Sequence, residues 1–165
     1  MSALLDILHP ETPQSFVLAA EERFFDAQEL FAKGRTTGAL YLAGFVAEML
    51  LKHACFRLRG AAVTDPVDRM FGPAMAWARR RMPRIKHEGK HSLWFWAMYV
   101  RRMRRELGRH FSEDFDQDLL RRARNLRRSW SVDLRYCEVV APSVEVKQAL
   151  VDVAWIRSNS SALWR

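Results

Sequence analysis

Residues 39–51 read ALYLAGFVAEMLL, a stretch that is apolar nearly all round when it is drawn as a helix. A helix without a polar face belongs in the centre of a bundle, where neighbouring helices cover every side of it. The surrounding pattern extends this helix over Thr36–Leu58. Small residues within it allow neighbouring helices to approach closely: Gly38, Ala43, Gly44 and Ala47. The sequence therefore predicts an all-α fold built around this helix.

One acidic residue, Glu48, lies inside that apolar stretch. A carboxylate in such a place could be catalytic, because burial and neighbouring charges tune its protonation. A buried charge also needs a partner of opposite sign. We favour a structural interpretation, in which Glu48 forms an ion pair with an arginine of another helix.

The remaining helices are expected to bury one side each. Apolar residues recur at three- and four-residue steps from Thr12 to Ala32, where Thr12 can cap the helix and Pro13 suits its first turn. Further helices are predicted at 92–107, from the cap Ser112 to about 130, and at 143–158, with a short helix at 74–81 and an extended segment at 131–141. Residues 1–165 should form a single domain, an all-α bundle of about five main helices plus one short helix.

Composition and the pattern of apolar residues indicate the cellular compartment of the protein. The chain has 165 residues, of which 49% are apolar, enough for one packed core. Its two cysteines, Cys55 and Cys137, provide neither a disulfide framework nor a four-cysteine zinc site, which favours a reducing compartment. Residues 1–10 lack the layout of a secretory signal, and the apolar run 39–51 is too short to span a membrane. We expect a cytoplasmic protein with no membrane partner.

Positive charge is the main functional signal. The formal net charge is +8, and 22 of the 27 basic residues are arginine. Residues 79–135 hold 17 basic and seven acidic residues, so the excess lies in the second half of the bundle. The arginine fork suits phosphate, which favours a nucleic-acid partner. Five arginines are expected to contact phosphates without reading bases: Arg101, Arg105, Arg121, Arg124 and Arg128.

The string HEGKH at positions 87–91 matches the zinc-hydrolase pattern of two histidines one helical turn apart with a glutamate between them. Such a site needs a regular helix in apolar surroundings, whereas Gly89 and Lys90 stand in the middle of this one. A third ligand would have to be His110 or Glu106. We interpret the string as a chance match in a basic loop, and we expect no metal and no cofactor.

Four segments, taken in order, carry a family resemblance: residues 34–52, His91-Ser92-Leu93, Arg124-Asn125 and Leu134-Arg135-Tyr136. Together they resemble the HEPN superfamily over about residues 15–158. In that resemblance the first two helices form a hairpin, and the second carries small residues and a glutamate shortly before a lysine, as Glu48 and Lys52 do here. The resemblance implies a HEPN-like helical bundle that usually forms a homodimer.

Active HEPN proteins are metal-independent ribonucleases that use an arginine, a polar residue and a histidine four to six positions after the arginine. The arginine can hold the scissile phosphate, and the histidine can move protons near neutral pH. Arg124 and Asn125 match the first half of this motif, but the histidine positions hold Ser129, Trp130 and Ser131. His110, or else His91, would have to supply the proton transfer. Whether the chain is an enzyme stays open, since Arg124 and Asn125 could equally be a surface pair or part of a dimer interface.

Aromatic residues offer a second possible nucleic-acid contact. Trp94, Phe95, Trp96 and Tyr99 fall within six helical positions and could stack on bases. Aromatic residues at this spacing more often fill a core or a subunit interface. We predict such a role for these four, and core positions for Trp130 and Tyr136.

These observations lead to one preferred function and two alternatives. The preferred one is a HEPN-like RNA-binding protein of a bacterial stress or defence system, such as toxin–antitoxin or antiviral defence, a context that the resemblance alone implies. The first alternative is a non-catalytic HEPN-like subunit that docks a protein partner such as a nucleotidyltransferase. The second is a metal-independent ribonuclease that uses Arg124.

Overall fold

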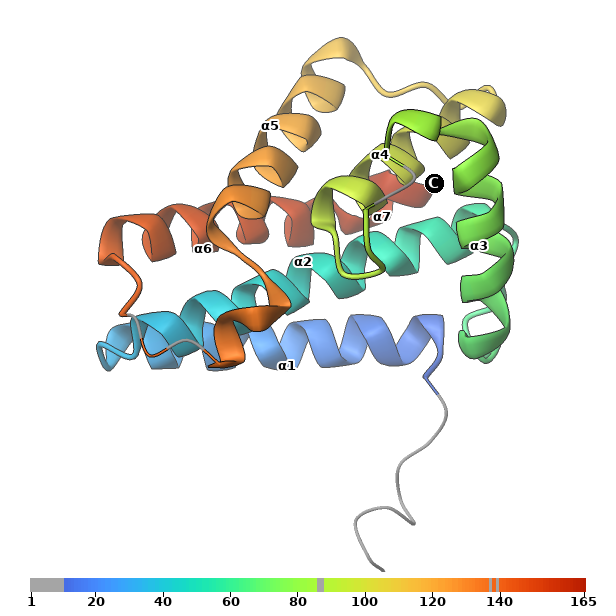
Figure 1. Ribbon diagram of the computed structural model, residues 1–165. Helices are drawn as coiled ribbons and strands as arrows, with labels where there is room; N and C mark the ends of the chain where they lie inside the picture. The colour runs from blue at the N-terminus through green and yellow to red at the C-terminus, as the bar shows by residue number, and fades with distance from the viewer. Residues whose placement is uncertain (1–10, 86–87, 137, 139) are drawn as a thin grey trace, which may run out of the picture.

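Helix α2 (Thr36–Leu58) runs through the middle of the molecule, as Figure 1 shows for this computed structural model. The structure describes residues 11–85, 88–136, 138 and 140–165. Around α2 lie α1 (Pro13–Ala32), α3 (Asp68–Arg81), η2 (Pro83–Ile85), α4 (Leu93–Glu106), α5 (Glu113–Ser129), η3 (Val132–Tyr136), α6 (Ser143–Ser158) and α7 (Ser160–Trp164). The described residues contain no strand, so the predicted all-α class is confirmed.

Burial of α2 explains its apolar sequence. Sixteen of its 23 residues are buried, and α1, α4, α6, α7 and η3 all pack on it. By length and composition α2 could cross a membrane, contrary to the expectation from the shorter run 39–51, but 78% of its apolar window is buried inside the protein. Its hydropathy is therefore that of a central core helix.

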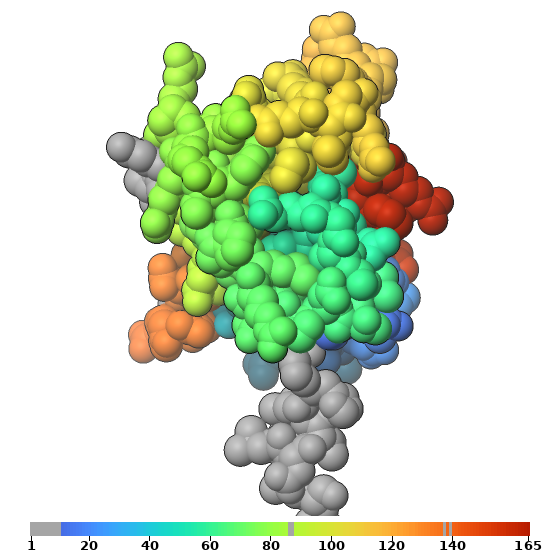
Figure 2. Space-filling model, turned by 90° about the vertical axis from the view of Figure 1, so that its right-hand side faces the viewer, coloured from blue at the N-terminus to red at the C-terminus, as the bar shows by residue number. Residues whose placement is uncertain are grey.

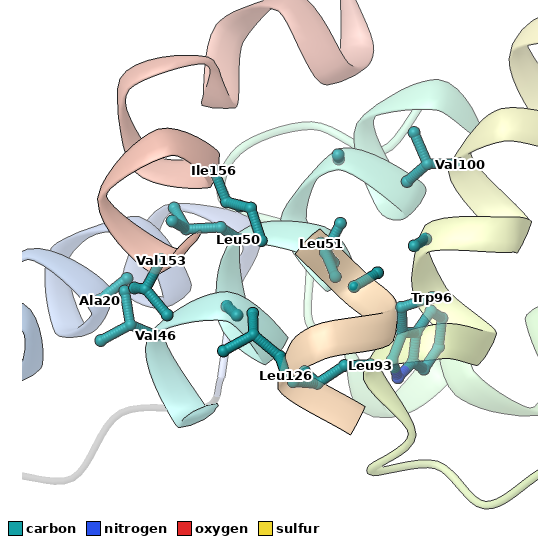
Figure 3. Close-up of a cluster of buried hydrophobic side chains, with 14 of the residues drawn as sticks. Ala20, Val46, Leu50, Leu51, Leu93, Trp96, Val100, Leu126, Val153 and Ile156 are labelled. Atoms are coloured by element: carbon teal, nitrogen blue, oxygen red, sulfur yellow. The ribbon is translucent and has the colours of Figure 1, made fainter. Parts of the chain in front are cut away.

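The core forms around α2, with side chains from the surrounding helices. Figure 3 shows Val46, Leu50 and Leu51 of α2 among apolar side chains from α1, α4, α5 and α6. The predicted aromatic core is also found: Phe95, Trp96 and Tyr99 of α4 are buried, as are Trp130 and Cys55. Cys55 is a free thiol, and burial raises its pKa well above the ordinary value. Cys137 lies outside the described residues.

Helix α1 begins and ends as the sequence indicates. Thr12 caps it through a hydrogen bond from the Ser15 amide to Thr12 Oγ1 (3.0 Å), and Pro13 occupies the first turn. Gly34 follows the helix with a φ of 73°, the left-handed conformation that glycine adopts readily. Near the start of α1, His53 Nδ1 donates to the carbonyl oxygen of Pro13 over 2.7 Å, and burial lowers the pKa of His53. The neutral imidazole thereby joins α2 to α1.

Helix α3 begins earlier than predicted, because Pro73 lies inside it instead of ahead of it. Proline removes one backbone hydrogen bond, which the sequence pattern treats as a break. Phe71 and Met75, on either side of Pro73, both pack against the core. Burial of these two side chains offsets the lost hydrogen bond, and the helix continues through Pro73.

The segment after α5 also differs from its prediction. Residues 132–136 form the short 3₁₀ helix η3 instead of part of the extended segment predicted at 131–141, and the sequence does not predict α7. Tyr136 was predicted to be in the core but is 74% exposed, with the Arg135 guanidinium 4.6 Å from its ring centre. Periodicity could not place it, because a short 3₁₀ turn has no repeating buried face.

Helices α4 and α5 lie antiparallel. Asp116 at the start of α5 pairs with Arg101 near the end of α4, and Arg124 lies over the Trp94 ring at 5.4 Å. Arg127 at the end of α5 pairs with Glu88, just ahead of α4. The numbers of the contacting residues fall toward the start of α4 as they rise along α5, so the two helices run in opposite directions.

The predicted close approach at a small residue of α2 is found at Gly44. A Cβ atom placed there would lie 2.1 Å from Cδ1 and Nε1 of the Trp130 ring. The indole Nε1 donates to the carbonyl oxygen of Tyr41 over 3.0 Å, which fixes the ring against the helix. Only glycine leaves room for this contact.

We predict that Gly44→Ala lowers the free energy of unfolding by about 1–3 kcal/mol, because the added methyl group must displace Trp130. Gly38→Ala on the same helix is the control, since its Cβ would meet only the flexible tip of Leu30 at 3.3 Å. Urea unfolding followed by tryptophan fluorescence measures both. Equal stability of the two variants would contradict the packing described here.

Candidate nucleic-acid interface and acid–base cluster

A cavity of about 300 Å³ lies between the end of α3, η2 and the second half of α4. Figure 2 shows these segments side by side on one face, the end of α3 and η2 in light green and the end of α4 in yellow. We call this cavity the arginine pocket; it is lined by Arg81, Met82, Pro83, Arg84, Ile85, Met98, Arg101, Arg102 and Arg105. No acidic side chain is among these lining residues. It is therefore a cationic cavity with an apolar floor.

Two carboxylates just outside the arginine pocket hold four of its arginines. Asp116 accepts hydrogen bonds from Arg101 Nε at 2.6 Å and 2.7 Å, and lies 3.5 Å from Arg105 Nη2. Glu106 accepts from Arg102 Nε at 3.1 Å and lies 3.8 Å from Arg81 Nε. Five guanidinium groups thus face two carboxylates, which leaves three positive charges without a counter-charge.

Availability to a ligand differs among these arginines. Arg101 is mostly covered and holds Asp116 with three donor contacts, so it joins α4 to α5. Arg81, Arg102 and Arg105 are half-exposed, and Arg84 is exposed with no acidic partner among the described residues. The four accessible guanidinium groups can reach a ligand phosphate.

The other three predicted phosphate arginines lie elsewhere. Arg121 and Arg124 line a shallow hollow that also contains Asp114 and Asp118, and Arg121 pairs with Asp118 at 2.5 Å. Arg128 borders a separate groove between α5 and α6. The five predicted residues therefore form three separate groups, of which only Arg101 and Arg105 share the arginine pocket.

Asn125 joins α5 to α6 through a side-chain hydrogen bond. Its side-chain amide donates to Oδ2 of Asp152 over 3.1 Å, and Arg122 Nη1 donates to Oδ1 over 2.9 Å. Asp152 is fully buried, so both contacts satisfy a carboxylate that has no access to water. Arg124, its neighbour in sequence, points instead to Trp94 of α4. The two residues that match the first half of the motif thus face different helices.

His110 lies far from Arg124 within one chain. It precedes α5, whereas Arg124 is eleven residues into that helix, about 16 Å along its axis. His110 is exposed at the surface. The single chain therefore does not bring the two candidate catalytic residues together.

A cluster that the sequence did not predict surrounds Glu48. Its Oε1 atom accepts hydrogen bonds from Lys52 Nζ, one turn along α2, and from His91 Nδ1 over 2.9 Å. Glu48 and Lys52 are buried, and the lysine ammonium lies 5.0 Å from the centre of the Phe71 ring. The predicted arginine partner was therefore wrong: the lysine lies close enough on the same helix, and the histidine completes the pair.

His91 opens onto a hollow of about 410 Å³. Because Nδ1 donates to Glu48, Nε2 of the neutral imidazole carries the lone pair, and the side chain is 38% exposed. Arg127 lines the same hollow and pairs with Glu88 at 2.5 Å, while Glu88 also accepts from the Ser92 hydroxyl at 2.6 Å. A carboxylate-oriented histidine beside an arginine can move a proton next to a bound anion.

Only part of the HEGKH string at 87–91, interpreted above as a chance match, lies within the described residues. His87 lies outside the described residues, whereas Glu88 and His91 are engaged with Arg127 and Glu48. Among the described residues, no group of three or more His, Cys, Asp or Glu side chains could hold a metal ion.

The fold and these sites define an all-helical protein with an arginine-lined cavity and a separate buried acid–base cluster. Comparisons of the chain with family models, curated proteins and solved structures find no match.

We predict that Glu48→Leu destabilises the fold by about 3–5 kcal/mol, because it leaves the buried Lys52 without a counter-charge. Lys52→Met should cost less, because His91 still donates a hydrogen bond to Glu48. The double variant should recover much of the lost free energy of unfolding, since it removes both buried charges. His91 is part-exposed and can then form hydrogen bonds with water. Urea unfolding of a double-mutant cycle measures this coupling.

Asp26→Ala is the matched control for that cycle. It breaks the half-exposed pair of Arg23 and Asp26 on α1 and should cost less than about 1 kcal/mol. If the effects of Glu48→Leu and Lys52→Met simply add, the two charges do not stabilise each other.

Proposed function

We propose that this chain is a HEPN-like RNA-binding protein that holds phosphates in and around the arginine pocket. The observation that carries the proposal is the gathering of five guanidinium groups about one cavity with only two carboxylates beside them. Phosphate accepts the paired donors of arginine, and three unbalanced positive charges attract a polyanion. The HEPN-like resemblance, with Glu48 and Lys52 in the matching places of α2, adds support for RNA.

Contacts of this kind give affinity without sequence preference. Arginines that bind phosphates release counterions, so the affinity falls as salt rises, by a slope of about −0.7 per phosphate contact on a single strand. Two of the four accessible members, Arg84 on η2 and Arg105 on α4, should carry such contacts. Arg101 should contribute mainly by holding α5 in place through Asp116.

We expect Arg84→Gln/Arg105→Gln to weaken binding of a short single-stranded RNA and to reduce the salt slope by about 1.4 in magnitude, because two phosphate contacts are lost. Fluorescence anisotropy between about 50 and 200 mM salt measures both quantities.

Lys33→Gln/Arg35→Gln is the charge-matched control. Both residues are exposed at the turn between α1 and α2, so this variant loses two charges away from the pocket. If the wild type shows no RNA binding at about 50 mM salt, the proposed function is wrong. If the two double variants weaken binding equally, the pocket is not the binding place.

A metal-independent ribonuclease is the second candidate. It is favoured by one observation, the orientation of His91 by the buried Glu48 in the same hollow as Arg127. His91 Nε2 would accept the 2′-hydroxyl proton while that oxygen attacks phosphorus. The bond from phosphorus to the 5′ oxygen would break, and the 5′ oxygen would take a proton from solvent water, leaving a 2′,3′-cyclic phosphate and a 5′-hydroxyl. Arg127, or Arg124 as the sequence motif suggests, would hold the phosphate charge.

We predict that, if this activity exists, His91→Gln reduces RNA cleavage in EDTA by about 100-fold or more, the usual contribution of a general base. Arg127→Gln and Arg124→Ala, measured beside it, identify the arginine that holds the phosphate. Negligible cleavage by the wild type would remove the enzyme candidate. Unchanged cleavage by His91→Gln would place the activity elsewhere.

The other expectations remain predictions. They comprise the homodimer, a protein partner such as a nucleotidyltransferase, the bacterial defence context and the cytoplasmic location. Exposed apolar side chains of α1 and α6, such as Phe25 and Val151, are available for a second copy or a partner.

A further inference from the structure

The floor of the arginine pocket differs from that of a simple phosphate site. Met82, Pro83, Ile85 and Met98 form it, and Met82 is buried while Ile85 and Met98 are partly buried against the core. A bare phosphate gains nothing from apolar surface, because it must be matched by hydrogen-bond donors. The cavity therefore fits a ligand that combines an apolar body with negative charge.

We propose that the arginine pocket takes one unstacked nucleobase of a single-stranded nucleic acid, with the adjoining phosphates held by the arginines at its rim. This inference rests on the proposed function and identifies the form of nucleic acid that it would bind. The base would lie on the methionine and proline floor, and the guanidinium groups would supply both flat stacking surfaces and phosphate donors.

Size supports a single base. The cavity has a volume of about 300 Å³ and is open to solvent, with room for one base and not for stacked base pairs. In a duplex the bases are stacked and paired inside, whereas unpaired bases can be splayed out and stacked on side chains such as arginine. Methionine is suited to this contact, because its thioether is flexible and favours aromatic partners.

Charge placement supports phosphates at the rim. Arg84 lies on η2 and Arg102 and Arg105 lie on α4, so exposed guanidinium groups flank the floor from two elements. Glu106 and Asp116 hold their partners from outside the cavity and leave its interior free of negative charge. A strand crossing the pocket would thus meet cations on both sides of the inserted base.

Base stacking is tolerant of sequence, because every base has a π face. The proposal therefore agrees with phosphate contacts that do not read sequence. It predicts a preference for single strands over duplexes and for intact strands over backbone alone.

The test compares two oligomers of equal charge. One is an oligouridylate of about eight nucleotides, and the other is an abasic sugar–phosphate oligomer of the same length. We expect the intact oligomer to bind about tenfold more tightly or better, the effect of one stacked base. Equal affinity for the two oligomers would overturn base insertion while leaving phosphate binding intact. Failure of both to bind at about 50 mM salt would overturn the proposed function as well.

A variant that fills the cavity locates the effect. Met98→Trp should reduce affinity for the intact oligomer to that of the abasic one and leave the abasic affinity unchanged. Ile85→Trp, on η2 instead of α4, provides a second filling variant if the first fails to fold, as judged by circular dichroism. Val144→Trp, at an exposed position of α6 outside the pocket, is the control. If the filling variants keep the preference for the intact oligomer, the base binds elsewhere.

Discussion

The burial of one carboxylate inside the most apolar helix governs much of this structure. Glu48 lies on α2 where neither water nor an apolar neighbour can satisfy its charge, so it requires donors close by. Lys52 supplies one from the same helix, and His91 supplies the other from the residues just ahead of α4. The second contact joins the segment just ahead of α4 to α2. Further along α4, Arg101 and Arg105 meet Asp116 of the antiparallel helix α5.

Helices with strong local signals were predictable from the sequence. The bounds of α2 agree with the prediction to the residue, and the predicted caps Thr12 and Ser112 mark the starts of α1 and α5. Helix α4 agrees with its predicted range of 92–107 to within one residue at each end. Prediction failed where burial outweighed a local rule, as at Pro73, which core contacts on both sides hold within α3. It also failed at Tyr136, where a short 3₁₀ turn offers no periodic face by which to judge burial. Elements set by local signals were thus predictable from the sequence, whereas effects of burial in the tertiary structure were not.

The candidate sites divide in the same way. Clustered basic residues predicted a cationic region, but a count of charges could not show that α3 and η2 turn their arginines toward those of α4. The pair Arg124-Asn125 looked like one unit in sequence, yet adjacent helical residues point about 100° apart, and here they face different helices. The signal available for the acid–base cluster was the spacing of Glu48 and Lys52, four residues apart on one helical face. Only the fold could add His91, which lies 43 residues further along the chain.

The two carboxylates beside the arginine pocket explain how so many like charges can share one cavity. Each lies between two arginines, so Asp116 and Glu106 lower the repulsion among four guanidinium groups without entering the space between them. Their hydrogen bonds also restrict the arginine side chains, which would otherwise lose conformational freedom when a ligand binds. Lysine could not replace arginine here, because one guanidinium can donate to a carboxylate through Nε and still present its remaining N–H groups to a phosphate. Arg102 shows this directly, since its Nε is bonded to Glu106 while the side chain stays half-exposed. The pocket itself therefore gives a structural reason for arginine over lysine at the positions that line it.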